Sequence, residues 1–126
     1  MKISDTLVQT IRHLPQPALI GISGFGGSGK TTFAQLLGEK LDVPVIGVDA
    51  FQTKGAFDTP FSLWKIMDFA RLEREVLQPF VRGDSSIRYG YFDATLECIT
   101  KTVEMHNNGT LVVEGVGLFR PELMQY

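Results

Sequence analysis

Apolar residues occur along this chain in two patterns, as short uninterrupted runs and as stripes spaced three and four residues apart. The runs predict strands buried in a parallel sheet, and the stripes predict helices. The predicted strands span 18–23, 45–48 and 110–114. The predicted helices span about 5–14, 29–41, 63 or 68 to 81, and 94–107. Because strands and helices alternate, the pattern predicts an α/β fold in which the 29–41 helix is a right-handed crossover.

The segments between these elements carry their own signals. Residues 50–63 are rich in Gly, Pro and Asp yet contain three phenylalanines, which indicates a loop that packs on the body or lines a pocket. The aromatic segment 88–93 is assigned no structure. Pro121 is well placed to open a helix. Cys98 lies within the predicted 94–107 helix and is interpreted as a small buried hydrophobe.

The stretch from Gly24 to Thr32 matches G-x-x-x-x-G-K-[ST], the phosphate-binding P-loop. It follows an apolar strand and opens a helical stripe, which is the context that the motif requires. Glycines let consecutive N–H groups turn toward a phosphate, and the helix N-terminus favours the same anion. Lys30 brings a charge to the β- and γ-phosphates, and Thr31 offers a hydroxyl to Mg²⁺. The residues assigned to ATP are Gly24, Gly26, Gly27, Ser28, Gly29, Lys30, Thr31 and Thr32.

Composition and charge narrow the class of protein. The chain has 126 residues, enough for one domain with a real core, and 44% of them are hydrophobic. The net charge of −2 argues against a nucleic-acid or anionic-membrane surface. The apolar runs are too short to span a membrane, the N-terminus does not resemble a signal peptide, and Cys98 has no second cysteine to pair with. We therefore expect a single cytoplasmic domain over residues 1–126.

Two carboxylates follow the predicted second and third strands. Asp49 and Glu114 come directly after valine-rich runs, and the carboxyl ends of parallel strands are where open α/β sheets bind ligands. A buried carboxylate there needs a partner. Mg²⁺ on nucleotide phosphates, or a substrate hydroxyl, would be that partner.

These residues together resemble a known family. The P-loop, then Val48-Asp49-Ala50-Phe51, then Val112-Val113-Glu114-Gly115-Val116, is similar to the uridine kinase group of P-loop kinases, relatives of phosphoribulokinase and bacterial pantothenate kinase. Segment 68–80 resembles the helix that follows the substrate loop in that group, and 88–93 resembles its nucleoside-side aromatic segment. The resemblance covers about residues 17–123.

The resemblance implies a role for each matching residue. Asp49 would be the base that accepts the proton of the substrate hydroxyl, and Lys30 would neutralise the transferring phosphoryl group. Thr31 and Glu114 would hold Mg²⁺, directly or through water. The aromatic residues expected to flank a nucleoside base are Tyr89, Tyr91 and Phe92. The acid that holds the ribose hydroxyls would be Asp58 or Asp68; Phe57-Asp58-Thr59-Pro60 has Thr59 where the family has histidine.

The resemblance also implies a three-layer α/β/α P-loop NTPase fold with a parallel sheet. From the family we expect the 18–23 strand to lie between the 45–48 and 110–114 strands. Family members continue past the third strand with two more strands and an arginine-bearing lid, so the C-terminal strands and lid are expected to be missing here. A second copy of the chain is one candidate to cover the exposed sheet edge.

The sequence predicts an ATP- and Mg²⁺-dependent kinase that phosphorylates a hydroxyl of a small molecule, most specifically the 5′-hydroxyl of uridine or cytidine. Three alternatives remain open. One is a kinase for another metabolite, such as pantothenate or a sugar. The second is a module that only binds or hydrolyses a nucleoside triphosphate, and the third is an inactive remnant. The aromatic-rich 50–63 loop favours a substrate pocket.

Overall fold

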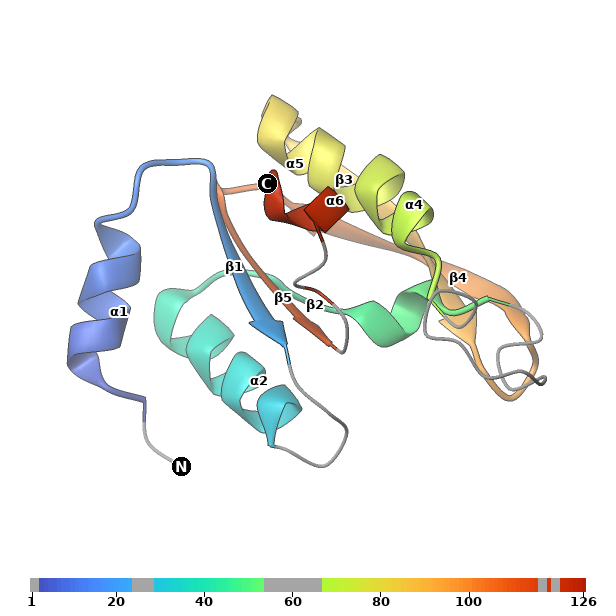
Figure 1. Cartoon of the computed structure of the whole chain (residues 1–126), viewed down its shortest axis with the longest axis horizontal. Coiled ribbons are helices and arrows are strands. Elements are labelled where there is room, and N and C mark those ends of the chain that lie inside the picture. Colours follow the sequence, from blue (N-terminus) through green and yellow to red (C-terminus); the bar gives the residue numbers. More distant parts are fainter. Residues whose placement is uncertain (1–2, 24–28, 54–66, 116–117, 119–120) are drawn as a thin grey trace.

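The computed structural model describes residues 3–23, 29–53, 67–115, 118 and 121–126 (Figure 1). The strands are β1 (Ala18–Ser23), β2 (Val45–Gly47), β3 (Ser86–Asp93), β4 (Cys98–His106) and β5 (Thr110–Gly115). The α-helices are α1 (Asp5–Arg12), α2 (Lys30–Leu41), α4 (Phe69–Leu72), α5 (Gln78–Arg82) and α6 (Pro121–Met124), with a 3-10 helix η1 (Val48–Phe51) and a π-helical turn η2 (Glu73–Leu77). Five candidate site residues lie outside the described residues: Gly24, Gly26, Gly27, Ser28 and Asp58.

Strands β1, β5 and β2 form a parallel sheet in that order. The predicted parallel pairing of the first and third strands is confirmed, but the expectation that the 18–23 strand lies in the middle is wrong. β5 is the middle strand. Its residues Leu111, Val112 and Val113 are all buried, whereas Gly21 of β1 is exposed. A middle strand is hydrogen-bonded along both edges and covered on both faces, which suits a continuous apolar run.

Helices cover both faces of this sheet, which confirms the three-layer α/β/α architecture (Figure 1). On one face, α1 and α2 pack on Val112 through buried residues that include Ile11 and Leu37. On the other face, Leu111 and Val113 lie in a second core with residues of α4, η2, α5 and α6. Successive β5 side chains point to opposite faces, so one short strand contributes to both cores.

The 69–82 helical run confirms the helix predicted there and contains a widened turn. Pro79 has no N–H, and its ring excludes the carbonyl of Glu75 from ordinary α-helical geometry. The π turn η2 lies just before this proline, and the N–H of Gln78 donates to the carbonyl of Glu73, five residues earlier. The run ends at Gly83, as the Arg82-Gly83-Asp84 sequence predicts.

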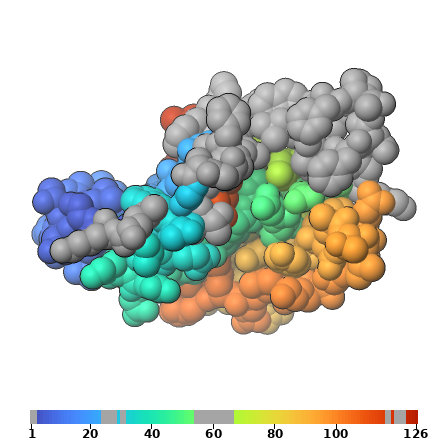
Figure 2. All heavy atoms as spheres, turned by 90° about the horizontal axis from the view of Figure 1, so that it is seen from below, coloured from blue at the N-terminus to red at the C-terminus, as the bar shows by residue number. Residues whose placement is uncertain are grey.

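The segment expected to form a helix over 94–107 is instead the second strand of a hairpin. β3 and β4 pair antiparallel over their length, with an irregularity between Tyr91 and Phe92. The connecting turn is held by Asp93, whose Oδ1 accepts from the N–H groups of Thr95 and Leu96. Cys98 is exposed in β4, so its interpretation as a buried hydrophobe is also wrong. Figure 2 shows this hairpin and α1 at opposite ends of the molecule, with α2 and η1 between them.

The outer edge of β1 pairs with no other strand in the part of the chain that the structure describes. The second copy expected to cover that edge therefore stays a prediction. Among the described residues, no helix is both long enough and apolar enough to cross a membrane.

Candidate active site at the carboxyl ends of the parallel strands

The parallel register brings three predicted features to one edge of the sheet. Ser23, the last residue of β1, lies opposite Gly115 of β5. Glu114 of β5 lies opposite Ile22 on one side and Gly47 of β2 on the other. Asp49 follows two residues after Gly47, in η1. The end of the strand that leads into the P-loop, Glu114 and the Asp49 turn are thus neighbours.

The predicted P-loop motif lies in the sequence between β1 and α2, the crossover helix beside the sheet, and its residues 24–28 lie outside the described residues. Its last glycine, Gly29, is the N-cap of α2 and has φ +81°, a conformation that L side chains rarely adopt. The carbonyl of Gly29 accepts the first helical hydrogen bond from the N–H of Phe33 at 3.0 Å. Lys30 and Thr31 form the start of α2, and Thr32 is exposed. The positive dipole end of this twelve-residue helix is its N-terminus, at Gly29.

The two acidic residues of the site differ in exposure. Asp49 is exposed, whereas Glu114 is only 8% exposed. The Oε1 of Glu114 lies 3.1 Å from the position that a Cβ on Gly47 would take, so the carboxylate lies over that glycine. The site therefore offers one carboxylate to solvent and a second one within the sheet edge.

Gly115 allows the end of β5 that carries Glu114 to pack closely against η1, the turn that contains Asp49. Its φ is +155°, and a Cβ added there would lie 2.5 Å from the Cβ of Val48. Only glycine allows β5 to approach η1 this closely. This close approach explains why a glycine follows Glu114.

The predicted substrate residues fall into two environments. Tyr89 and Phe92 are buried, and Tyr89 stacks on Phe51 with ring centroids 5.3 Å apart. Burial, and to a lesser extent the neighbouring Tyr91, raises the pKa of Tyr89 above its ordinary value. Tyr91 is 40% exposed, with the Nζ of Lys101 4.9 Å from its ring centroid. Tyr91 is thus the member of the aromatic set that presents its ring at the surface.

Asp68 lies at the start of α4, where its side chain takes part in a hydrogen bond to the helix. Its Oδ1 accepts from the N–H of Arg71 at 2.9 Å, which makes it the helix N-cap. Its own N–H donates to the carbonyl of Phe51 at 2.6 Å, so the cap also contacts the end of η1. One carboxylate oxygen therefore has a structural partner within the fold.

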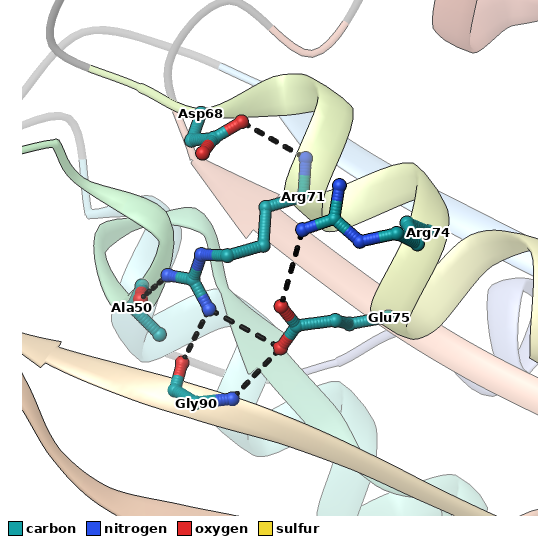
Figure 3. Close-up of polar contacts among 6 residues, drawn as sticks. All are labelled: Ala50, Asp68, Arg71, Arg74, Glu75 and Gly90. Carbon is teal, nitrogen blue, oxygen red and sulfur yellow. Dashed lines mark hydrogen bonds and ion pairs between the residues drawn. The ribbon is translucent and has the colours of Figure 1, made fainter.

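The structure adds two residues that the sequence reasoning did not single out, Arg71 and Glu75 (Figure 3). Arg71 is 6% exposed and donates to the carbonyls of Ala50 and Gly90. Glu75 accepts from Arg71 and from the N–H of Gly90. A charged pair four residues apart, each next to a buried helix position (Leu72 and Val76), is the sequence signal that could have found them.

Comparisons with known proteins identify the fold. No protein family model matches the chain, and no curated protein matches its sequence. A protein described as a possible uridine kinase, from Bacillus stearothermophilus, matches with a TM-score of 0.80 and 23% identity over 97% of this chain and 74% of its own. A protein provisionally described as a fructose transport system kinase, from Silicibacter sp. TM1040, matches with a TM-score of 0.74 and 21% identity over 95% of this chain and 68% of its own.

At these identities the likeness concerns the fold. The TM-scores of 0.80 and 0.74 extend over nearly the whole of this chain. The chain therefore has the fold of the P-loop kinases, as its resemblance to the uridine kinase group predicts.

Proposed function

We propose that this chain is an ATP-dependent phosphotransferase that phosphorylates a hydroxyl group of a small molecule. The observation that carries the proposal is the meeting of three features at one sheet edge: the strand end that leads into a P-loop motif, the Asp49 turn, and Glu114. Ligands of open α/β sheets bind at this edge. A fold shared with proteins described as kinases supports the same reaction class.

The nucleotide half of the site comes from the P-loop motif. Backbone N–H groups of the loop and the N-terminus of α2 would bind the phosphates, and Lys30 would neutralise the γ-phosphate. Thr31 and Glu114 would hold Mg²⁺, because hydroxyl and carboxylate oxygens are the donors that this ion prefers. Bound with ATP, the ion supplies positive charge to the phosphate oxygens.

The donor set in the described residues fits such an ion. They contain no group of three or more His, Cys, Asp or Glu residues that could hold a metal on their own. Mg²⁺ usually takes one or two protein oxygens and fills its remaining positions with phosphate and water. Glu114, which is nearly buried at the strand end, suits that limited share.

Asp49 would act as the general base. It is exposed in η1, two residues after the end of β2, where an acceptor hydroxyl can approach it. A base must come within about 3 Å of the proton that it abstracts. Phosphoryl transfer depends mainly on positioning and charge, so one carboxylate aimed at the acceptor suffices for the proton transfer.

The acceptor that we favour is a pyrimidine nucleoside, with Tyr91 offering an exposed ring for the base and Asp58 or Asp68 a carboxylate for the ribose. Tyr89 and Phe92 would shape this side from within the core. A sugar is the second candidate, because one structural neighbour is described as a fructose transport system kinase. The remaining alternatives are a pantothenate kinase, a module that only binds or hydrolyses a nucleoside triphosphate, and an inactive remnant.

The test is transfer of labelled phosphate from Mg·ATP to a panel of uridine, cytidine, fructose and pantothenate, with the product identified by mass. A phosphorylated nucleoside is the expected product. A phosphorylated sugar or pantothenate would reassign the acceptor. ATP binding without any product would leave a nucleotide-binding module and overturn the proposal.

A further inference from the structure

Arg71 is the most deeply buried arginine among the described residues, and the proposed reaction does not use it directly. Its guanidinium lies between three elements. Nη2 donates to the carbonyl of Ala50 in η1 at 2.6 Å, and Nη1 donates to the carbonyl of Gly90 in β3 at 2.8 Å. Nη1 also lies 3.3 Å from Oε1 of Glu75. The side chain comes from α4, so one residue joins a helix, a turn and a strand.

A buried guanidinium is retained only when its charge and donors are matched. Glu75 supplies the opposite charge, and the guanidinium carbon lies 4.4 Å from the ring centroid of Phe51. That ring in turn stacks on Tyr89. Arginine offers a planar fork that can reach two separate carbonyls, which the single ammonium of lysine does not. The contacts of Arg71 therefore call for arginine rather than for any cation.

The same contacts fix Gly90 through both of its backbone groups (Figure 3). Its carbonyl accepts from Arg71, and its N–H donates to Oε1 of Glu75 at 2.9 Å. Gly90 lies between Tyr89 and Tyr91, two of the acceptor-side candidates. Ala50, at the other end of the guanidinium, is adjacent to Asp49. Arg71 thus connects the residue next to the proposed base with the strand that carries the proposed acceptor contact.

We propose that Arg71 is a positioning residue that holds the Asp49 turn at a fixed place relative to the acceptor strand β3. For the role of Asp49 this inference rests on the proposed function. Loss of Arg71 is expected to leave the nucleotide half of the site intact, because none of its contacts with the described residues reaches β1 or α2. Arg71 therefore acts on acceptor binding and turnover and leaves ATP affinity unchanged.

The test compares Arg71→Met with Arg82→Met, an exposed arginine of α5 that pairs only with exposed Asp84 among the contacts described. Hydrogen exchange over residues 48–53 reports directly on the η1 turn. Losing charged hydrogen bonds to Ala50 and Gly90 is expected to speed exchange there at least about tenfold in Arg71→Met and to leave it unchanged in Arg82→Met. Arg71→Lys keeps the charge but not the fork, and is expected to resemble Arg71→Met.

In Arg71→Met the carboxylate of Glu75 loses its charge partner, which can itself destabilise the fold. A second pair of variants controls for this effect. Glu75→Gln keeps an oxygen for the N–H of Gly90 and the link from Arg71 to Ala50 but removes the charge partner of the guanidinium, so exchange over 48–53 is expected to speed up less than in Arg71→Met. Arg71→Met combined with Glu75→Gln removes both charges and the Ala50 link. It is expected to fold and still exchange rapidly over 48–53.

The kinetic arm uses the acceptor found in the substrate panel. In Arg71→Met, turnover is expected to fall at least about tenfold and the acceptor KM to rise, while the dissociation constant for Mg·ATP stays within about twofold. Unchanged exchange over 48–53, or an ATP affinity that falls as far as turnover, would overturn the positioning role. If the wild-type chain transfers no phosphoryl group, the proposed function fails, whereas the exchange data still decide whether Arg71 holds the turn to β3.

Discussion

Replacing Asp68 by alanine separates the two roles open to this residue, helix cap and substrate ligand. In the structure its Oδ1 accepts from the N–H of Arg71 at 2.9 Å. The backbone bonds of Asp68, to Phe51 and from Leu72, do not involve the side chain and survive the change. The loss is therefore one cap hydrogen bond and one negative charge at a helix start.

The expected cost follows from those two terms. An N-cap replaced by alanine costs about 1 kcal/mol, with a range of about 0.5–2 kcal/mol, and the charge at the helix start adds about 0.3–1 kcal/mol. Asp68→Ala should therefore lower the free energy of unfolding by about 1–2 kcal/mol. Asp68→Asn keeps the acceptor oxygen and loses only the charge, so it should cost about half as much or less.

Urea unfolding of wild type, Asp68→Ala and Asp68→Asn measures these differences, and titration with the acceptor measures binding in the same variants. Ser4→Ala is an internal comparison, because Ser4 caps α1 through a longer and exposed contact of 3.4 Å to the N–H of Leu7. We predict a smaller cost there. An unchanged stability of Asp68→Ala would refute the cap. An acceptor affinity that falls tenfold or more in Asp68→Asn, at near-native stability, would assign the carboxylate to the substrate instead.

Three further predictions each concern one residue. Gly115→Ala should lower the free energy of unfolding in urea by about 2–4 kcal/mol, since Gly115 has φ +155° and a Cβ added there would lie 2.5 Å from the Cβ of Val48; a cost under about 1 kcal/mol would contradict this. Burial raises the pKa of Tyr89 above 10.0, so the folded state keeps that proton longer than the unfolded state. This contribution to the free energy of unfolding is complete below about pH 10 and is lost as pH rises through the folded-state pKa. Tyr89→Phe should therefore show a smaller loss of unfolding free energy over that pH range than the wild type. An identical pH dependence in the two proteins would contradict this prediction. Lys30→Ala should weaken Mg·ATP binding about 10–100-fold by calorimetry with an unchanged circular dichroism spectrum, and unaltered affinity would remove Lys30 from the phosphate site.

The sequence predicts the elements best where local pattern and burial agree. The strand at 110–114 is apolar on both faces, and the helix after Gly29 follows a glycine-rich loop, so both appear where the pattern puts them. The order of the strands is a tertiary property. It depends on which strand gains most from cover on every side, and the sequence alone does not compare Thr110–Gly115 with Ala18–Ser23 in that respect.

The 94–107 segment shows why a helical spacing can mislead. Leu96, Ile99 and Val103 are three and four residues apart, yet Leu96 and Ile99 are exposed in the hairpin. Pairing with β3 outweighs the helical spacing of these apolar residues. The hydrogen bonds between the two strands and the half-buried side chains of Val103 and Met105 favour a strand. The β-branched residues from Ile99 to Val103 carried that signal.

The candidate site also has one part that can be predicted from the sequence and another part that cannot. The P-loop motif can be found from its spacing, because a backbone turn around a phosphate requires glycines, and the two acids can be found because each directly follows an apolar run. The Arg71–Glu75 contacts with Ala50 and Gly90 are not readable, since they join segments 15–21 residues apart through side chains. Only the fold brings these segments together.

The central claim is that Asp49 removes the acceptor proton beside a P-loop-bound ATP. Its most direct test is the rate of phosphoryl transfer by Asp49→Asn, with Mg·ATP affinity measured on the same sample. Turnover is expected to be about 10²–10⁴-fold below that of the wild type, with an ATP dissociation constant within about twofold of the wild-type value. Full turnover by Asp49→Asn would contradict the assignment of Asp49 as the general base and remove it from the chemical step.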